Sequence, residues 1–245
     1  MRADKRMLFE FSVPENSSSL KPKIRPTAEP PNGNLFRDHL LSKAHVLQGL
    51  QSQSLADLRK GQLILHSLKR SLTFTQSQQL ASLARLTHEK HFDSRKYDVT
   101  ELLVPGGLVL GITMSASARD FHELLHEEIL SVNYVNALHP GNMVGAISYI
   151  QGVEEVPGDL QMVTVRTFGI KNLDVVKELD HVDLPLELFE LGSSQTRGGG
   201  GGDGIKAKAI QQICKSKCPI LHNQIVVQVD RRILRQAPKQ DVFLL

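Results

Sequence analysis

The protein has 245 residues, with 29 lysines and arginines against 26 aspartates and glutamates. At about 100–200 residues per domain, this length suits one large domain, or one medium domain with long appendages. Two cysteines and no tryptophan exclude a disulfide-rich secreted module and favour a reducing compartment. The longest apolar stretch, over 102–114, is shorter than the roughly 20 residues of a membrane span, and no signal-peptide pattern opens the chain. We therefore expect a soluble, mostly globular protein without a membrane span.

The beginning of the chain is predicted to be an extended arm outside the core. Residues 1–34 contain five prolines and no apolar periodicity, so they cannot bury enough surface to offset the entropy of ordering. The arm starts with basic residues such as Arg2 and Lys5, which is typical of an import signal, but Asp4 and Glu10 depart from an acid-poor transit peptide. A mitochondrial location is the prediction, and a cytoplasmic location is the alternative.

Hydrophobic periodicity then predicts both helices and strands. Some segments space their apolar residues with the period of a helix, and others alternate apolar and polar residues one by one. The sequence Val-Pro-Gly-Asp at 156–159 is a strong hairpin signal between two of the strands. In chain order the predicted elements are a helix over 35–56, a strand over Gly61–Thr73, a helix over 76–86 capped by Thr75, a helix over Leu102–Leu125, strands over 129–138, 143–155 and 160–170, and a last strand over Ile225–Leu234. One long apolar helix with antiparallel strands indicates an α+β fold in which a curved sheet wraps around the helix.

Five short motifs carry a resemblance to a known family. In the family's order they are His91–Asp93 with Tyr97, Gly106–Gly107, Pro140–Asn142, Val163–Gly169, and Val226–Leu234 with its Arg231-Arg232 pair. The sequence resembles the MaoC-like dehydratases and (R)-hydratases of the hot-dog fold, most of all the mesaconyl-CoA hydratase branch. The resemblance covers roughly 58–170 plus 223–236 and implies an antiparallel sheet around a long central helix. The predicted domain comprises 35–170 plus 223–236, and 237–245 is a tail.

The resemblance also implies a catalytic site, of which this sequence keeps only a part. The family adds or removes water at the α,β-bond of an acyl thioester, with an aspartate and a histidine that together hold the water. His91 stands at the histidine position, but Leu86 stands five residues earlier, where the family has its aspartate, and the loop is shortened. Glu89 and Asp93 lie two residues from His91 on either side, so an extended segment would place the three side chains on one face. These three residues are the candidate catalytic group.

Gly106 and Gly107 are the candidate substrate-binding residues. By the resemblance, their amides at the start of the central helix polarise the thioester carbonyl, and the helix dipole favours the developing negative charge. The alternative is structural, because a Pro-Gly-Gly turn before a buried helix needs only a backbone conformation that glycine tolerates.

The segment 171–222 is a long insertion before the last strand, where the family turns directly from strand to strand. Residues 173–191 carry six carboxylates and one lysine, a glycine-rich linker follows over 192–204, and 205–239 holds eight lysines and arginines with one aspartate. Opposite charge blocks of this kind dock on partners or pair with each other. The alternative interpretation is two short helices with solvated charged faces.

The sequence predicts no metal site and no cofactor. Cys214 and Cys218 share a helical face with His222 nearby, but a structural zinc site needs four ligands. His122 and His126 around Glu123 do not have the spacing of a zinc protease. Phosphate-binding and dinucleotide-binding glycine motifs are absent from the sequence.

Two functions from different classes remain open. The favoured one is a hot-dog protein without catalysis, a structural subunit of a larger assembly such as the mitochondrial ribosome, because the acid partner is missing and the arm and insertion add docking surface. The alternative is a hydratase or dehydratase of acyl-CoA or acyl-carrier-protein substrates. The resemblance also implies a homo- or heterodimer through the sheet. The basic arms could contact RNA phosphates.

Overall fold

A computed structural model describes residues 58–118, 120–121, 124–191 and 203–237, together with 38–39 and 42. The predicted arm, the predicted helix over 35–56 apart from three positions, most of the glycine-rich linker and almost all of the tail lie outside these residues. The chain divides into two units, Met1–His39 and Leu40–Leu245, and the sheet belongs to the second. No helix in the described part of the chain is long and apolar enough to cross a membrane.

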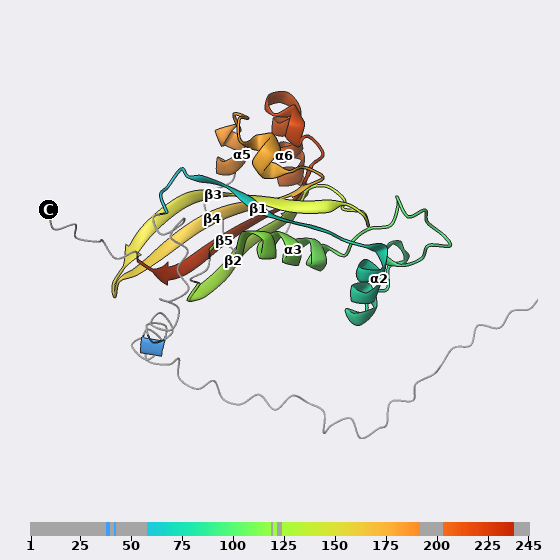
Figure 1. The fold of residues 1–245 in the computed structure, drawn as a ribbon, viewed down its shortest axis with the longest axis horizontal. Coiled ribbons are helices and arrows are strands. Elements are labelled where there is room, and N and C mark those ends of the chain that lie inside the picture. Colours follow the sequence, from blue (N-terminus) through green and yellow to red (C-terminus); the bar gives the residue numbers. More distant parts are fainter. Residues whose placement is uncertain are drawn as a thin grey trace, which may run out of the picture. The chain divides into compact units, whose positions relative to one another are not determined.

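The centre of the second unit is a five-stranded antiparallel sheet in the order β1-β3-β4-β5-β2 (Figure 1). A helix, α3, crosses one face of this sheet, which we call the inner face (Figure 1). The strands are β1 (Leu63–Ser71), β2 (His126–Tyr134), β3 (Met143–Val156), β4 (Leu160–Lys171) and β5 (Ile225–Gln236). The predicted α+β arrangement of an antiparallel sheet around a central helix is thus confirmed.

Helix α3 spans Gly106–Ala118, so the predicted helix over Leu102–Leu125 is too long at both ends. The preceding residues are extended, because the Val104 amide donates to the Leu138 carbonyl at 2.9 Å before Pro105 begins the first turn. The helix packs closely on β4, where a Cβ atom at Gly169 would collide with the Thr113 hydroxyl. Glycine at this position therefore allows the helix and the sheet to approach each other.

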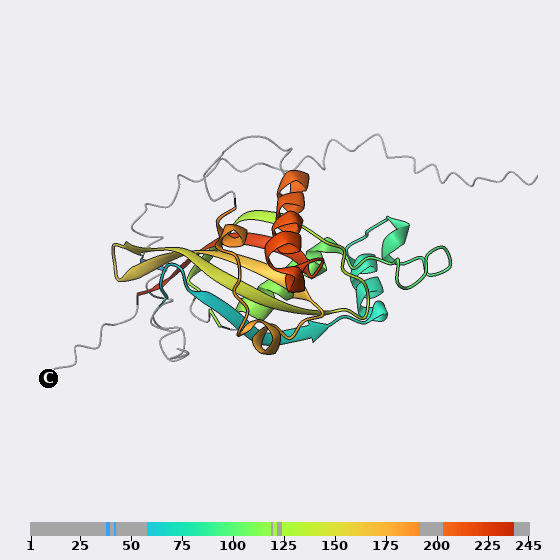
Figure 2. The ribbon, with the colours of Figure 1, turned by 90° about the horizontal axis from the view of Figure 1, so that it is seen from above.

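The opposite, outer face of the sheet carries three helices from the chain between β4 and β5 (Figures 1 and 2). They are α4 (Val175–Leu179), α5 (Leu186–Glu190) and α6 (Asp203–Lys217). Phe189 of α5 stacks on Tyr149 and meets Phe168 edge to face, with ring centroids 4.9 and 5.6 Å apart. The segment that the sequence marks as an insertion therefore buries the outer face of the sheet, and its helices are more than solvated surface elements.

Arg166 of β4 anchors this outer layer. Its buried guanidinium donates to both carboxylate oxygens of Asp230 at 2.6 and 2.9 Å. The remaining nitrogen donates to the carbonyls of Phe189 and Leu191 at 2.9 and 2.7 Å. These carbonyls belong to the last turn of α5, where a cation also interacts favourably with the helix dipole. The buried charge is thus paired, and it fixes α5 to the sheet.

Local capping decides where helix α2 (Phe74–Leu83) begins. Thr73 is the N-cap, because its side chain accepts a bond from the Gln76 amide and the Gln76 side chain accepts one from the Thr73 amide. The prediction of Thr75 as the cap is therefore wrong by two residues. The predicted strand over 129–138 is also displaced, since β2 begins at His126 and ends at Tyr134.

A buried hydrogen-bond chain connects β1 to the segment after α3. The His66 ring donates from Nδ1 to Asp120 at 2.5 Å and accepts at Nε2 from the Ser148 hydroxyl at 2.8 Å, and Ser148 lies 2.8 Å from the Thr167 hydroxyl. Burial lowers the pKa of His66; Asp120 opposes this shift, and the nearby Arg231 adds to it. His66 is therefore neutral in the folded protein at neutral pH.

We expect Arg166→Met to destabilise the protein by about 3–5 kcal/mol, because it leaves the carboxylate of Asp230 and two carbonyls buried without their partner. Urea unfolding followed by circular dichroism measures the change. The matched control is Arg95→Met on an exposed loop, for which we expect a change within about 0.5 kcal/mol. Equal effects of the two substitutions would contradict the anchoring role of Arg166.

We expect the free energy of unfolding to fall as the pH drops below the ordinary histidine pKa of about 6.5, because the unfolded chain then binds a proton that folded His66 resists. Urea unfolding at about pH 7.5 and about pH 5.5 measures the loss. In His66→Gln this contribution is absent, so the loss should be smaller. A loss of the same size in both proteins would show that His66 does not contribute.

Candidate functional site

His91 lies in a short 3-10 helix, Glu89–His91, between α2 and α3. Its Nδ1 atom lies 2.9 Å from the carbonyl oxygen of Leu103. A carbonyl only accepts, so Nδ1 carries a proton and donates it to Leu103. The half-buried imidazole is therefore oriented by the backbone before α3.

The two candidate carboxylates are occupied elsewhere. Glu89 forms an ion pair with Lys96, which raises the pKa of the Lys96 ammonium. One oxygen of Asp93 accepts from the amides of Arg95 and Lys96 at 3.0 and 3.3 Å, which makes a local turn. The segment is a 3-10 turn, not the extended chain that would align the three side chains. Within the described part of the chain, neither carboxylate hydrogen-bonds to His91.

The two candidate glycines differ in their surroundings at the start of α3. A Cβ atom at Gly106 would lie 3.0 Å from Cζ and 3.1 Å from the hydroxyl oxygen of Tyr134, whereas one at Gly107 would meet nothing within 4 Å. The Tyr134 ring of β2 thus covers Gly106, and Gly107 is open. Nothing in the sequence placed Tyr134 against the helix start.

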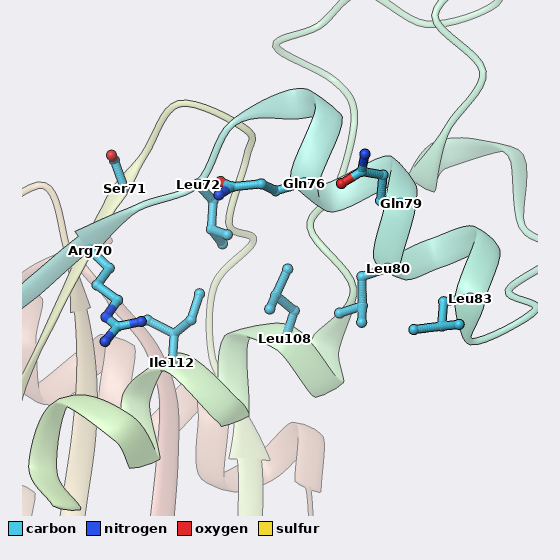
Figure 3. Close-up of a pocket in the computed structure, with 9 residues that line it drawn as sticks. All are labelled: Arg70, Ser71, Leu72, Gln76, Gln79, Leu80, Leu83, Leu108 and Ile112. Atoms are coloured by element: carbon cyan, nitrogen blue, oxygen red, sulfur yellow. The ribbon is translucent and has the colours of Figure 1, made fainter.

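The structure also contains a groove that the sequence did not indicate. It has a volume of about 400 Å³ and lies between α2, the end of β1 and α3 (Figure 3). Leu80 of α2 and Leu108 of α3 point toward one another across it, and the Arg70 guanidinium lies beside Ile112 (Figure 3). The lining residues are Arg70, Ser71, Leu72, Gln76, Gln79, Leu80, Leu83, Leu108 and Ile112. None of the five candidate residues lines the groove, so it is separate from the predicted site.

The cysteine pair is part of the core. Cys214 and Cys218 of α6 are free thiols buried against the outer face of the sheet. Burial raises the pKa of Cys214 to about 12, so its thiol stays protonated and is a poor metal ligand. Across the described ranges, no three or more histidine, cysteine or acidic side chains are grouped so that they could hold a metal ion.

Comparison with solved structures relates this geometry to known proteins. The chain is similar to a MaoC domain protein described as a dehydratase from Chloroflexus aurantiacus, with a TM-score of 0.51 and 20% identity over 78% of this chain and 46% of that one. For a MaoC-like dehydratase from Rhodospirillum rubrum the TM-score is 0.47 and the sequence identity 11%. The match covers 75% of this chain and 96% of that one. For a Mycobacterium tuberculosis protein with a double hot-dog fold the TM-score is 0.45 and the sequence identity 12%. The match covers 75% of this chain and 44% of that one.

This chain spans about half the length of the Chloroflexus protein. No family model and no curated protein matches the sequence. At 20% identity the likeness to the Chloroflexus protein establishes the fold and does not extend to activity. The chain has the hot-dog fold that the motifs implied.

The surroundings of the two glycines predict opposite effects of alanine. Gly107→Ala should stabilise the protein by about 0.5–1 kcal/mol, because it restricts the unfolded chain and meets no neighbour. Gly106→Ala should give no such gain, because its methyl group would press on the Tyr134 ring. Urea unfolding of both variants tests this. Equal stabilisation would show that Tyr134 does not lie against the helix start.

Proposed function

We propose that this chain is a non-catalytic hot-dog protein that serves as a structural subunit of a larger assembly, for example in the mitochondrial ribosome. The observation that carries the proposal is the separation of His91 from the carboxylates of Glu89 and Asp93. The outer helix layer supports the role as a structural subunit, because it adds exposed surface beyond the sheet and its central helix.

Hydration of an acyl thioester needs an imidazole and a carboxylate that hold the same water molecule. A general base works within about 2.6–3.2 Å of the proton that it removes, directly or through one water. Here Nδ1 of His91 is bonded to a carbonyl, Glu89 is bonded to Lys96, and Asp93 is bonded to its own turn. Misplacement of a catalytic group by about 1 Å already costs about a hundredfold in rate. These contacts therefore support a binding role over a hydratase.

The outer layer offers the chemistry of a protein-binding surface. Val176 of α4 and Leu186 of α5 are 39% and 50% exposed. The same segment carries the exposed acidic residues Glu178, Asp180 and Asp183. On α6, Ile205 is 72% exposed. An ion pair of Glu187 with Lys217 joins the acidic and basic blocks and lowers the pKa of Glu187. The two blocks thus pair with each other in part.

A dimer through the sheet stays a prediction. Strand β2 lies at one edge of the sheet, and its Ile129 and Leu130 are 49% and 43% exposed. Within the described ranges no strand lies beyond β2, and a partly apolar edge favours pairing with another strand. Light scattering of the purified chain distinguishes a dimer from a monomer.

The absence of hydratase activity is the first test. We expect purified full-length protein and His91→Ala to hydrate crotonyl-CoA at the same rate as buffer, followed by loss of enoyl absorbance. An authentic (R)-hydratase in the same assay is the positive control. Activity in the unmodified chain that His91→Ala abolishes would overturn the proposal and support the acyl-thioester hydratase alternative.

Assembly is the second test. Val176→Ser with Leu186→Ser should release the protein from a large complex in a sucrose gradient of mitochondrial extract, because both side chains lose apolar contact with the partner. Val99→Ser, at a loop residue 48% exposed, is the matched control and should stay bound. Ribonuclease treatment separates RNA contacts of the basic arms from protein contacts. Migration of the unmodified chain as a free protein contradicts the proposal. Removal of the whole insertion is not informative, because it uncovers buried Phe168 and Ile147.

A further inference from the structure

We propose that the groove between α2 and α3 is a binding site for a small anionic amphiphile, a medium-chain carboxylate, whose head is held by Arg70. This inference does not depend on the proposed function, because it concerns binding and not water addition. The groove volume of about 400 Å³ lies within the usual range for small-ligand sites, about 300–1,000 Å³.

Strand register places the Arg70 side chain in the groove. Arg70 of β1 pairs directly with Val144 of β3, and directly opposite residues of an antiparallel pair point to the same face. Val144 is buried in one cluster with Leu72 and Ile112, on the α3 side of the sheet. Figure 3 accordingly shows the guanidinium beside Ile112. The cation therefore lies at one end of an apolar floor.

Arg70 differs from its neighbour Lys69 in having no acidic partner. Lys69 forms an ion pair with Asp174, which precedes α4 on the outer face. Among the residues that the structure describes, the Arg70 side chain forms no ion pair and no hydrogen bond. A guanidinium presents paired donors that match a carboxylate or a phosphate in a bidentate manner. The free cation thus indicates an anionic head group.

The rest of the groove fits an apolar tail. Leu80 of α2 faces Leu108 of α3 (Figure 3), and Leu83, further along α2 at the end of the groove, is 81% exposed. At the rim, the oxygen of the Gln76 side chain is used by Thr73 for helix capping, which leaves its NH₂ group as a donor. Donors at one end and leucines at the other favour an amphiphile whose head accepts hydrogen bonds.

Isothermal titration of the full-length chain with sodium octanoate tests the site. We expect saturable binding that Arg70→Gln weakens by about tenfold or more, because a charge-assisted bidentate contact is lost. The control is Arg85→Gln, an exposed arginine just beyond α2 that does not line the groove, which should leave the affinity unchanged. Leu83→Ser, at a highly exposed position that folding tolerates, should also weaken binding.

Related probes identify the chemistry of the head group. 1-Octanol should bind more weakly than octanoate if Arg70 holds the charge, and octyl phosphate shows whether the anion can be a phosphate. The proposal is overturned if octanoate does not bind, or if Arg70→Gln and Arg85→Gln bind equally well. It is also overturned if groove variants change the oligomeric state by light scattering and not ligand affinity, because the groove is then an interface between copies. The crotonyl-CoA assay stays independent of each of these results.

Discussion

The packing of α3 against the inner face of the sheet is the contact on which the rest of the structure depends. The helix buries Val109, Ile112 and Ala116, and it approaches β4 closely because residue 169 is glycine. A helix that is apolar on nearly every side cannot be covered by one sheet alone. On the side away from the sheet, α2 and α3 line the groove together, with Leu80 facing Leu108 (Figure 3).

Both faces of the sheet combine apolar packing with a buried ion pair. The inner face holds the hydrogen-bond chain from His66 and the pair of Arg231 with Glu127, whereas the outer face holds the charged anchor of Arg166 and Asp230. A buried guanidinium is tolerated there because every donor direction in use meets a carboxylate or a carbonyl. The same arginine orders α5, so the outer layer and the sheet fold as one unit.

The candidate site shows how local turns can change the chemistry of a retained motif. His91 is oriented by the Leu103 carbonyl, and the turn that carries Asp93 uses its carboxylate to bond backbone amides. Glu89 and Asp93 are close to His91 in the chain, but their carboxylates bond Lys96 and backbone amides of the turn. Neither carboxylate therefore reaches the His91 ring.

The sequence by itself determined the class of fold, the five strands to within a few residues, and the central helix, because apolar periodicity and the Val-Pro-Gly-Asp turn are local signals. It could not locate the start of α3, where the Val104 amide bonds the distant Leu138 carbonyl. The cap at Thr73 was a local signal that the prediction missed, because its capping box with Gln76 spans only four residues. Only the tertiary structure decided the cover over Gly106 by Tyr134, the role of Arg166 under α5, and the groove at Arg70. Each of these features joins elements that are distant in the chain. The apolar periodicity of a segment predicts its secondary structure, but it does not predict which distant side chains it will contact.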